Sequence, residues 1–212
     1  MCWNATTSIV SFIIGTILNI AVMISFKSEL IYTICIAWQW VLMMQLSEYL
    51  IWMDQKCGTV NEIGTNSALI FNITQPIIVF LCLIAVSKSE NKYKVIASIS
   101  ILLYICYIIY NLNIYNNYKC IKPTENCAHL NLKWWSDFKY SGIIFSIILS
   151  IIILCLSPLS IGIFTIFYIF LFNFISMTFY GCGGPSMWCW FVVIYPLFLA
   201  LFYKYYYLKN NS

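Results

Sequence analysis

Residues 30–53 read LIYTICIAWQWVLMMQLSEYLIWM, a run in which Glu48 is the only charged side chain. A helix that crosses a membrane needs about 20 consecutive apolar residues, so this run is long enough for one crossing. The whole chain has the same character, because its 212 residues are 62% hydrophobic and only 8% charged. Soluble domains carry about 25% charged residues. The composition therefore excludes a soluble enzyme and a nucleic-acid-binding protein, and it predicts a polytopic membrane protein whose constant partner is the lipid bilayer.

Working outward from this run, the sequence contains seven apolar stretches, at residues 8–26, 30–53, 66–86, 95–110, 141–156, 159–179 and 188–208. The fourth and fifth stretches are short, so we expect their ends to extend into the loop between them or the bilayer to thin around them. Ser157-Pro158 separates the fifth stretch from the sixth, and because proline breaks helices we expect a tight turn there. The sequence predicts an all-α bundle of seven transmembrane helices, forming a single membrane domain over residues 1–212.

The lysines set the expected orientation of this bundle. Lys27 follows the first stretch and no basic residue precedes that stretch, so the positive-inside rule places the N-terminus outside and the C-terminus inside. Six of the 11 basic residues then lie inside, and four of the five outer ones share one long loop. Asn4 begins an Asn-Ala-Thr sequon on the outer side and is a candidate glycosylation site.

Six cysteines lie between the predicted spans, and all of them fall on the predicted outer side: Cys2, Cys57, Cys120, Cys127, Cys182 and Cys189. An even number of cysteines on the oxidising side predicts disulfides, although 15 pairings are possible. Pairing by proximity joins Cys120 to Cys127 and Cys182 to Cys189, which leaves Cys2 for Cys57.

Structural disulfides that staple the outer loops are the simplest interpretation of these cysteines. A redox-active pair remains an alternative, although the chain has no CxxC motif. A metal site formed with His129 is a second alternative, but it lacks the paired ligand spacing of known sites. We expect no metal or other cofactor.

Glu48 is the only charged side chain well inside a predicted span, and we expect it to face the bundle interior. Counting ~1.5 Å per residue places Glu48, Asn72 and Asn173 at a common depth, roughly 8–9 Å below the outer boundary. Gln45 and Gln75 come about one helical turn deeper.

Pro76 lacks an N–H and should leave one backbone carbonyl unpaired near Asn72. The five polar side chains and this carbonyl predict a polar layer below the cysteine-bearing loops. One interpretation of the layer is an outward-facing pocket around Glu48 for a small molecule or an ion. The alternative is that these groups hydrogen-bond across helices and lock the bundle together.

Part of the chain resembles a known family. The resemblance rests on Met1-Cys2-Trp3, Gln45-x-x-Glu48-Tyr49, Trp52, Asp54, Cys57, Asn61 and Gln75-Pro76, with a further likeness at Trp188-Cys189. These residues resemble an uncharacterised family of small multipass membrane proteins that begin Met-Cys-Trp and occur in bacteria, algae and giant viruses. The resemblance covers mainly residues 1–80. It supports the predicted topology and draws attention to the layer around Glu48 and Gln75, but it implies no reaction.

The sequence departs from this family at two places. Many members have Asp-Gln-Cys in the first outer loop, whereas Lys56 intervenes before Cys57 here. Many members also have a histidine just before the Gln-Pro pair, where this chain reads Asn72-Ile73-Thr74. Any role of that histidine is therefore absent or altered.

These patterns favour a non-enzymatic membrane protein, such as a transporter, a sensor or a viral membrane component. The alternative is a membrane enzyme that uses its outer thiols for thiol–disulfide chemistry. The chain has 37 isoleucines and no arginine, a bias typical of an AT-rich genome such as that of a large DNA virus. A host or virion membrane is therefore a candidate location. The sequence does not determine the oligomeric state.

Overall fold

The computed structural model describes residues 4–115, 119–123, 130, 132, 134, 140–180 and 184–211. Within these residues every regular element is a helix and there is no strand. In chain order the elements are α1 (Ala5–Ser25), α2 (Glu29–Met53), α3 (Thr59–Ile73), α4 (Gln75–Val86), α5 (Asn91–Tyr115), α7 (Ser141–Leu156), α8 (Leu159–Tyr180), α9 (Gly184–Phe202), the π-helical η2 (Tyr203–Tyr207) and α10 (Leu208–Asn211). The all-α prediction is confirmed.

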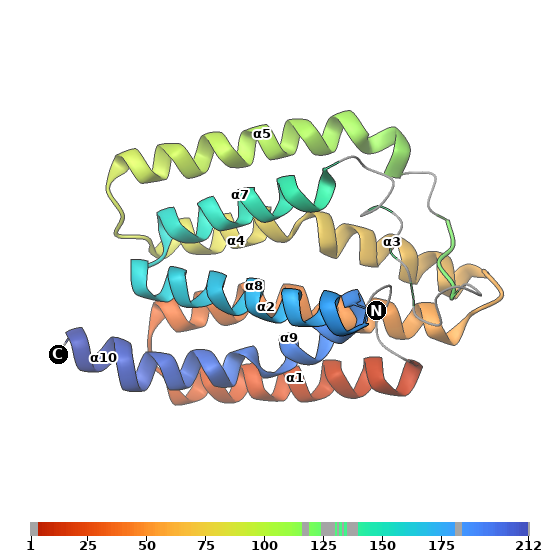
Figure 1. Cartoon of the computed structure of the whole chain (residues 1–212), viewed down its shortest axis with the longest axis horizontal. Coiled ribbons are helices and arrows are strands. Elements are labelled where there is room, and N and C mark those ends of the chain that lie inside the picture. Colours follow the sequence, from red (N-terminus) through yellow and green to blue (C-terminus); the bar gives the residue numbers. More distant parts are fainter. Residues whose placement is uncertain are drawn as a thin grey trace.

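The helices lie side by side along one axis, and the chain runs back and forth between the two ends of the bundle (Figure 1). One end holds the start of α1, the α2–α3 turn, the end of α5 and the start of α7. The other end holds the α1–α2, α4–α5 and α7–α8 turns and the C-terminus. Helix α2 is the central element, because it packs against α1, α3, α4 and α9. Its Ile31, Leu42 and Ile51 side chains are fully buried.

Among the described residues, five helices are long and apolar enough to cross a membrane, and the bent pair α3–α4 makes a sixth. Helix α7 is equally apolar but has only 16 residues. The fourth span reaches Tyr115, so the expected extension into the loop is confirmed there. The tight turn at Ser157-Pro158 is also confirmed, because α7 ends at Leu156 and α8 begins at Leu159.

The third predicted span differs from the structure, because it begins seven residues earlier than expected and is broken. Helices α3 and α4 meet at Thr74 with a bend of 46°. Pro76 cannot donate a hydrogen bond to the Asn72 carbonyl, which explains a break at this point. The prediction of an unpaired backbone carbonyl near Asn72 is wrong, however, because the Thr74 N–H donates to the carbonyls of Asn72 and Ile70.

Side chains of neighbouring helices donate hydrogen bonds to two other polar groups at this break. The Tyr104 hydroxyl of α5 donates to the Ile73 carbonyl at 2.9 Å. The Trp40 indole of α2 donates to the Thr74 hydroxyl at 2.9 Å. The bend is therefore stabilised from both sides by tertiary hydrogen bonds.

A disulfide joins Cys57, in the α2–α3 turn, to Cys120, which follows α5. This pair corrects the pairing expected from proximity, because it uses one cysteine from each of two expected bonds. Proximity along the chain fails here because the fold brings together residues 63 positions apart. Cys2, Cys127 and Cys182 lie outside the described residues, as do His129 and the side chain of Cys189.

Asn61 binds the same two segments next to the disulfide. Its side-chain amide donates to the carbonyls of Ile121 and Ile51, at 2.8 and 3.3 Å. Its side-chain oxygen accepts from the Ile121 N–H at 3.2 Å and from the Thr65 hydroxyl at 3.2 Å. Asn61 is fully buried, so all four bonds are shielded from water. This carboxamide therefore fixes the segment after α5 onto the start of α3.

We predict that Asn61→Ala lowers the free energy of unfolding by about 3 kcal/mol, because it leaves buried backbone groups of Ile121 unpaired. The measurement is denaturation of the purified protein in mixed micelles. The matched control is Asn111→Ala, since the buried Asn111 amide bonds only to Tyr107 in its own helix, and we expect it to lose under about 1 kcal/mol. Equal losses in the two variants would contradict this role of Asn61.

Candidate functional site

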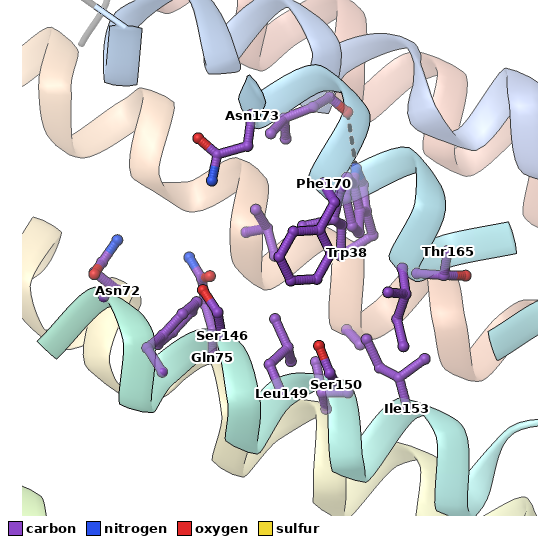
Figure 2. A pocket seen from close by; sticks show the side chains of 18 of the residues that line it. Trp38, Asn72, Gln75, Ser146, Leu149, Ser150, Ile153, Thr165, Phe170 and Asn173 are labelled. Carbon is purple, nitrogen blue, oxygen red and sulfur yellow. Dashed lines mark hydrogen bonds between the residues drawn. The ribbon is translucent and has the colours of Figure 1, made fainter. Parts of the chain in front are cut away.

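A cavity of about 770 Å³ lies between α7 and α8, and its remaining walls come from α2, the end of α3, α4 and α9. This volume is in the range of small-molecule sites. Figure 2 shows polar side chains around this cavity: Asn72 and Gln75 from the bent pair α3–α4, Ser146 and Ser150 from α7, and Asn173 from α8. Most of the remaining lining is aliphatic or aromatic. The described lining residues include no Asp, Glu, Lys or His.

The floor of the cavity is formed by Trp38 of α2 and Tyr195 of α9, whose rings are stacked with centroids 3.8 Å apart. Pro196 follows Tyr195 inside α9 and cannot donate to the Val192 carbonyl four residues earlier. The Trp38 indole takes the place of that donor, at 2.8 Å (dashed line in Figure 2). A proline in one helix is thus matched by a tryptophan in another.

Hydrogen bonds also fix the α8 side of this floor. The hydroxyls of Tyr195 and Thr165 are 3.0 Å apart and share a hydrogen bond. The Tyr168 hydroxyl donates to the Phe191 carbonyl at 2.6 Å. The floor is therefore rigid, and its polar atoms have partners within the protein.

Five polar side chains on the walls of the cavity, unlike those of its floor, lack hydrogen-bond partners among the described residues. Among the described residues, the side chains of Asn72, Gln75, Ser146, Ser150 and Asn173 have no hydrogen-bond partner, and the Asn72 oxygen is also fully buried. Several helical serines and threonines elsewhere donate to a carbonyl of their own helix, as Ser98 does to Lys94 and Ser100 does to Ile96. The hydroxyls of Ser146 and Ser150 make no such bond and border the cavity instead.

The structure brings four of the five predicted polar residues to this cavity: Gln45, Asn72, Gln75 and Asn173. Glu48 is not among the lining residues; it is fully buried, one turn along α2 from Gln45. The cavity is therefore centred between α7 and α8 and not around Glu48. The sequence analysis missed Ser146 and Ser150, although their spacing of four residues on one apolar helix was a detectable signal.

The cavity opens between α7 and α8. Ile143 and Ile147 of α7 and Phe170 of α8 all border it, and each is more than half exposed. Asn173 is also exposed on this side. The rim of the opening is thus mainly apolar, with one carboxamide at its edge.

The predicted glycosylation site has a structural role in the fold. The Asn4 side chain accepts a hydrogen bond from the Thr7 N–H at 2.8 Å and caps the start of α1. Asn4 is exposed. Its modification stays a prediction.

Comparisons of the chain with protein-family models, with curated proteins and with solved structures found no match. The resemblance of residues 1–80 to the Met-Cys-Trp family therefore stays a prediction, and the cavity is interpreted from its own chemistry.

We predict that Trp38→Phe lowers the free energy of unfolding by about 1–2 kcal/mol, because the Val192 carbonyl loses its only donor in this geometry. In a Pro196→Ala background the loss should be smaller, since residue 196 then carries an N–H that can bond Val192. The measurement is a double-mutant cycle of unfolding free energies in micelles. Strictly additive losses would contradict the pairing of Trp38 with Pro196.

Proposed function

We propose that this protein is an integral membrane protein that crosses the bilayer seven times, with its N-terminus outside. Seven helical units support this: α1, α2, the bent pair α3–α4, α5, α7, α8, and α9 with its C-terminal extension. They alternate in direction (Figure 1). The disulfide Cys57–Cys120 is at one end, as expected on an oxidising face. The α1–α2 turn with Lys27 and the α4–α5 turn with Lys88 are at the other end.

The orientation can be tested without mutation by an amine-reactive reagent that does not cross membranes. Applied to intact cells, it should label Lys56 and Lys122 but not Lys88 or Lys209, all of which are exposed. Permeabilised cells, in which all four should react, are the control. Mass spectrometry of the labelled peptides gives the result. Labelling of Lys88 in intact cells to the level of Lys56 would reverse or refute the topology.

Within that topology, the protein binds a small molecule in the cavity between α7 and α8, as a transporter or a sensor does. The observation that carries this proposal is the set of five wall side chains without hydrogen-bond partners among the described residues. A polar group away from water costs roughly 1–3 kcal/mol when it lacks a partner. A bound molecule that hydrogen-bonds these groups would offset that cost.

For three of the five predicted polar residues, this observation weighs against the alternative in which they lock the bundle. Asn72, Gln75 and Asn173 make no hydrogen bond across helices within the described part of the chain. Interhelical locking is instead done by Asn61, Trp38 and Asn19, whose side-chain amide donates to the Cys35 carbonyl at 2.7 Å.

The second alternative, a thiol–disulfide enzyme, gains no support from the described cysteines. Cys57–Cys120 lies beside the fully bonded Asn61, which binds the same two segments, and this arrangement favours a structural staple.

Native mass spectrometry of the protein released from its own membrane tests the proposal. We expect a small molecule of defined mass to remain bound to the unmodified chain and to be lost from Ser146→Trp, whose indole fills the cavity. Ser146→Leu is a second, smaller substitution in case the first does not fold. Ile99→Trp is the control, because Ile99 is exposed on α5 and does not line the cavity. The same adduct on all four proteins would refute the cavity as the site.

A further inference from the structure

We infer that the ligand is a neutral amphiphile with a hydroxyl-bearing head and one apolar chain, and that it reaches the cavity sideways from the lipid bilayer. This inference rests on the proposed function and specifies the ligand of the same site. It depends on three features of the cavity: where it opens, how polarity is distributed along it, and which charges it lacks.

The opening between α7 and α8 faces the space that lipid occupies around a membrane-spanning bundle. Its rim side chains Ile143, Ile147 and Phe170 are 58%, 52% and 51% exposed. Large exposed apolar side chains in the middle of a membrane helix are solvated by acyl chains and not by water. A molecule that passes between them therefore comes from the bilayer and carries apolar surface.

Polarity changes along the length of the cavity. Within the cavity, the polar side chains of Asn72, Gln75, Ser146 and Asn173 lie nearer to the disulfide end of the bundle than the apolar lining residues farther along the same helices. Toward the α7–α8 turn the same helices contribute mainly aliphatic side chains, such as Leu83, Ile153 and Ile166. The Thr165 hydroxyl at this end is already bonded to the Ile161 carbonyl and the Tyr195 hydroxyl. The cavity is itself amphipathic, so a bound amphiphile places its head near the disulfide end and its chain toward the turn.

The chemistry of the head follows from the groups that meet it. Carboxamides and hydroxyls both donate and accept hydrogen bonds, and alcohol groups match them in both roles. A charged head would leave the hydration of the membrane surface for a wall whose described residues carry no opposite charge. Such an unpaired charge is strongly disfavoured in a low-dielectric site. The lining thus selects a neutral head.

The apolar end is large enough to hold part of an acyl or isoprenoid chain. The full cavity of about 770 Å³ extends from the Asn72 side chain to Leu83, which is about three turns of helix, or roughly 16 Å. The stacked Trp38 and Tyr195 rings give the chain a flat, fully hydrogen-bonded surface. A single chain beside this surface fits the geometry better than a compact polar solute.

Four probes with the same 18-carbon chain test the inference: monooleoylglycerol, oleyl sulfate, oleyltrimethylammonium and octadecene. Each is titrated against the detergent-solubilised protein and binding is measured by native mass spectrometry. We expect monooleoylglycerol to bind at least about tenfold more tightly than the other three. The two ionic heads keep their charge at all working pH values, so protonation does not confuse the comparison.

Substitution of the head-binding residues completes the experiment. We expect Gln75→Leu and Asn173→Leu each to weaken monooleoylglycerol binding about tenfold without lowering thermal stability, because these carboxamides have no partner in the described protein to lose. Asn91→Leu is the matched control, since Asn91 is exposed at the start of α5 and remote from the lining. A drop in stability with unchanged binding would show that the carboxamides are structural and overturn the inference.

The remaining outcomes separate the inference from the proposed function. If oleyl sulfate or oleyltrimethylammonium binds as tightly as monooleoylglycerol, the inference of a neutral head is wrong, but the cavity remains a binding site. Preference for oleyltrimethylammonium in particular would show that the carboxylate of Glu48 controls the site from outside the lining. If no probe binds but the adduct that depends on the cavity persists, the inference of an amphiphilic ligand is wrong and the proposed binding function stands. If neither is seen, both proposals fail.

Discussion

A membrane interior offers no water to hydrogen-bond a polar group, so every such group in the spans must find its partner within the protein. This constraint explains where the large polar side chains of this bundle lie. Trp38 bonds the Val192 carbonyl freed by Pro196, and Tyr104 bonds the Ile73 carbonyl at the α3–α4 break. Each helix interruption is therefore matched by a donor from another helix. Five polar side chains on the walls of the cavity between α7 and α8 make no such bond among the described residues, and that is why this cavity is the candidate site.

The central position of α2 depends on close packing as well as on hydrogen bonds. A Cβ on Gly64 of α3 would lie 2.9 Å from the Ile51 nitrogen and the Ser47 carbonyl oxygen of α2, so only glycine permits this approach of the two helices. The same contact region contains Asn61, and the disulfide closes it from outside. The ends of α2, α3 and α5 nearest the disulfide are therefore held firmly.

Several features of the candidate site were accessible from residue spacing. Counting depth along helices places Asn72, Gln75 and Asn173 in one layer, and all three line the cavity in the structure. Depth alone does not give the direction of a side chain around its helix. Glu48 has the depth of the layer but does not line the cavity, whereas Ser146 and Ser150 line it from an otherwise apolar helix. Proximity also failed for Cys57, whose partner is 63 residues away.

The sequence by itself determined the all-α membrane architecture, the approximate helix bounds and the tight turn at Ser157-Pro158. It could do so because apolar run length and proline chemistry are local properties. Only the tertiary structure decided the pairing of Cys57 with Cys120, the matching of Trp38 to the Pro196 break, and the cavity lined by α7 and α8. These depend on how the helices rotate and pack against one another, and many distant contacts together set that packing.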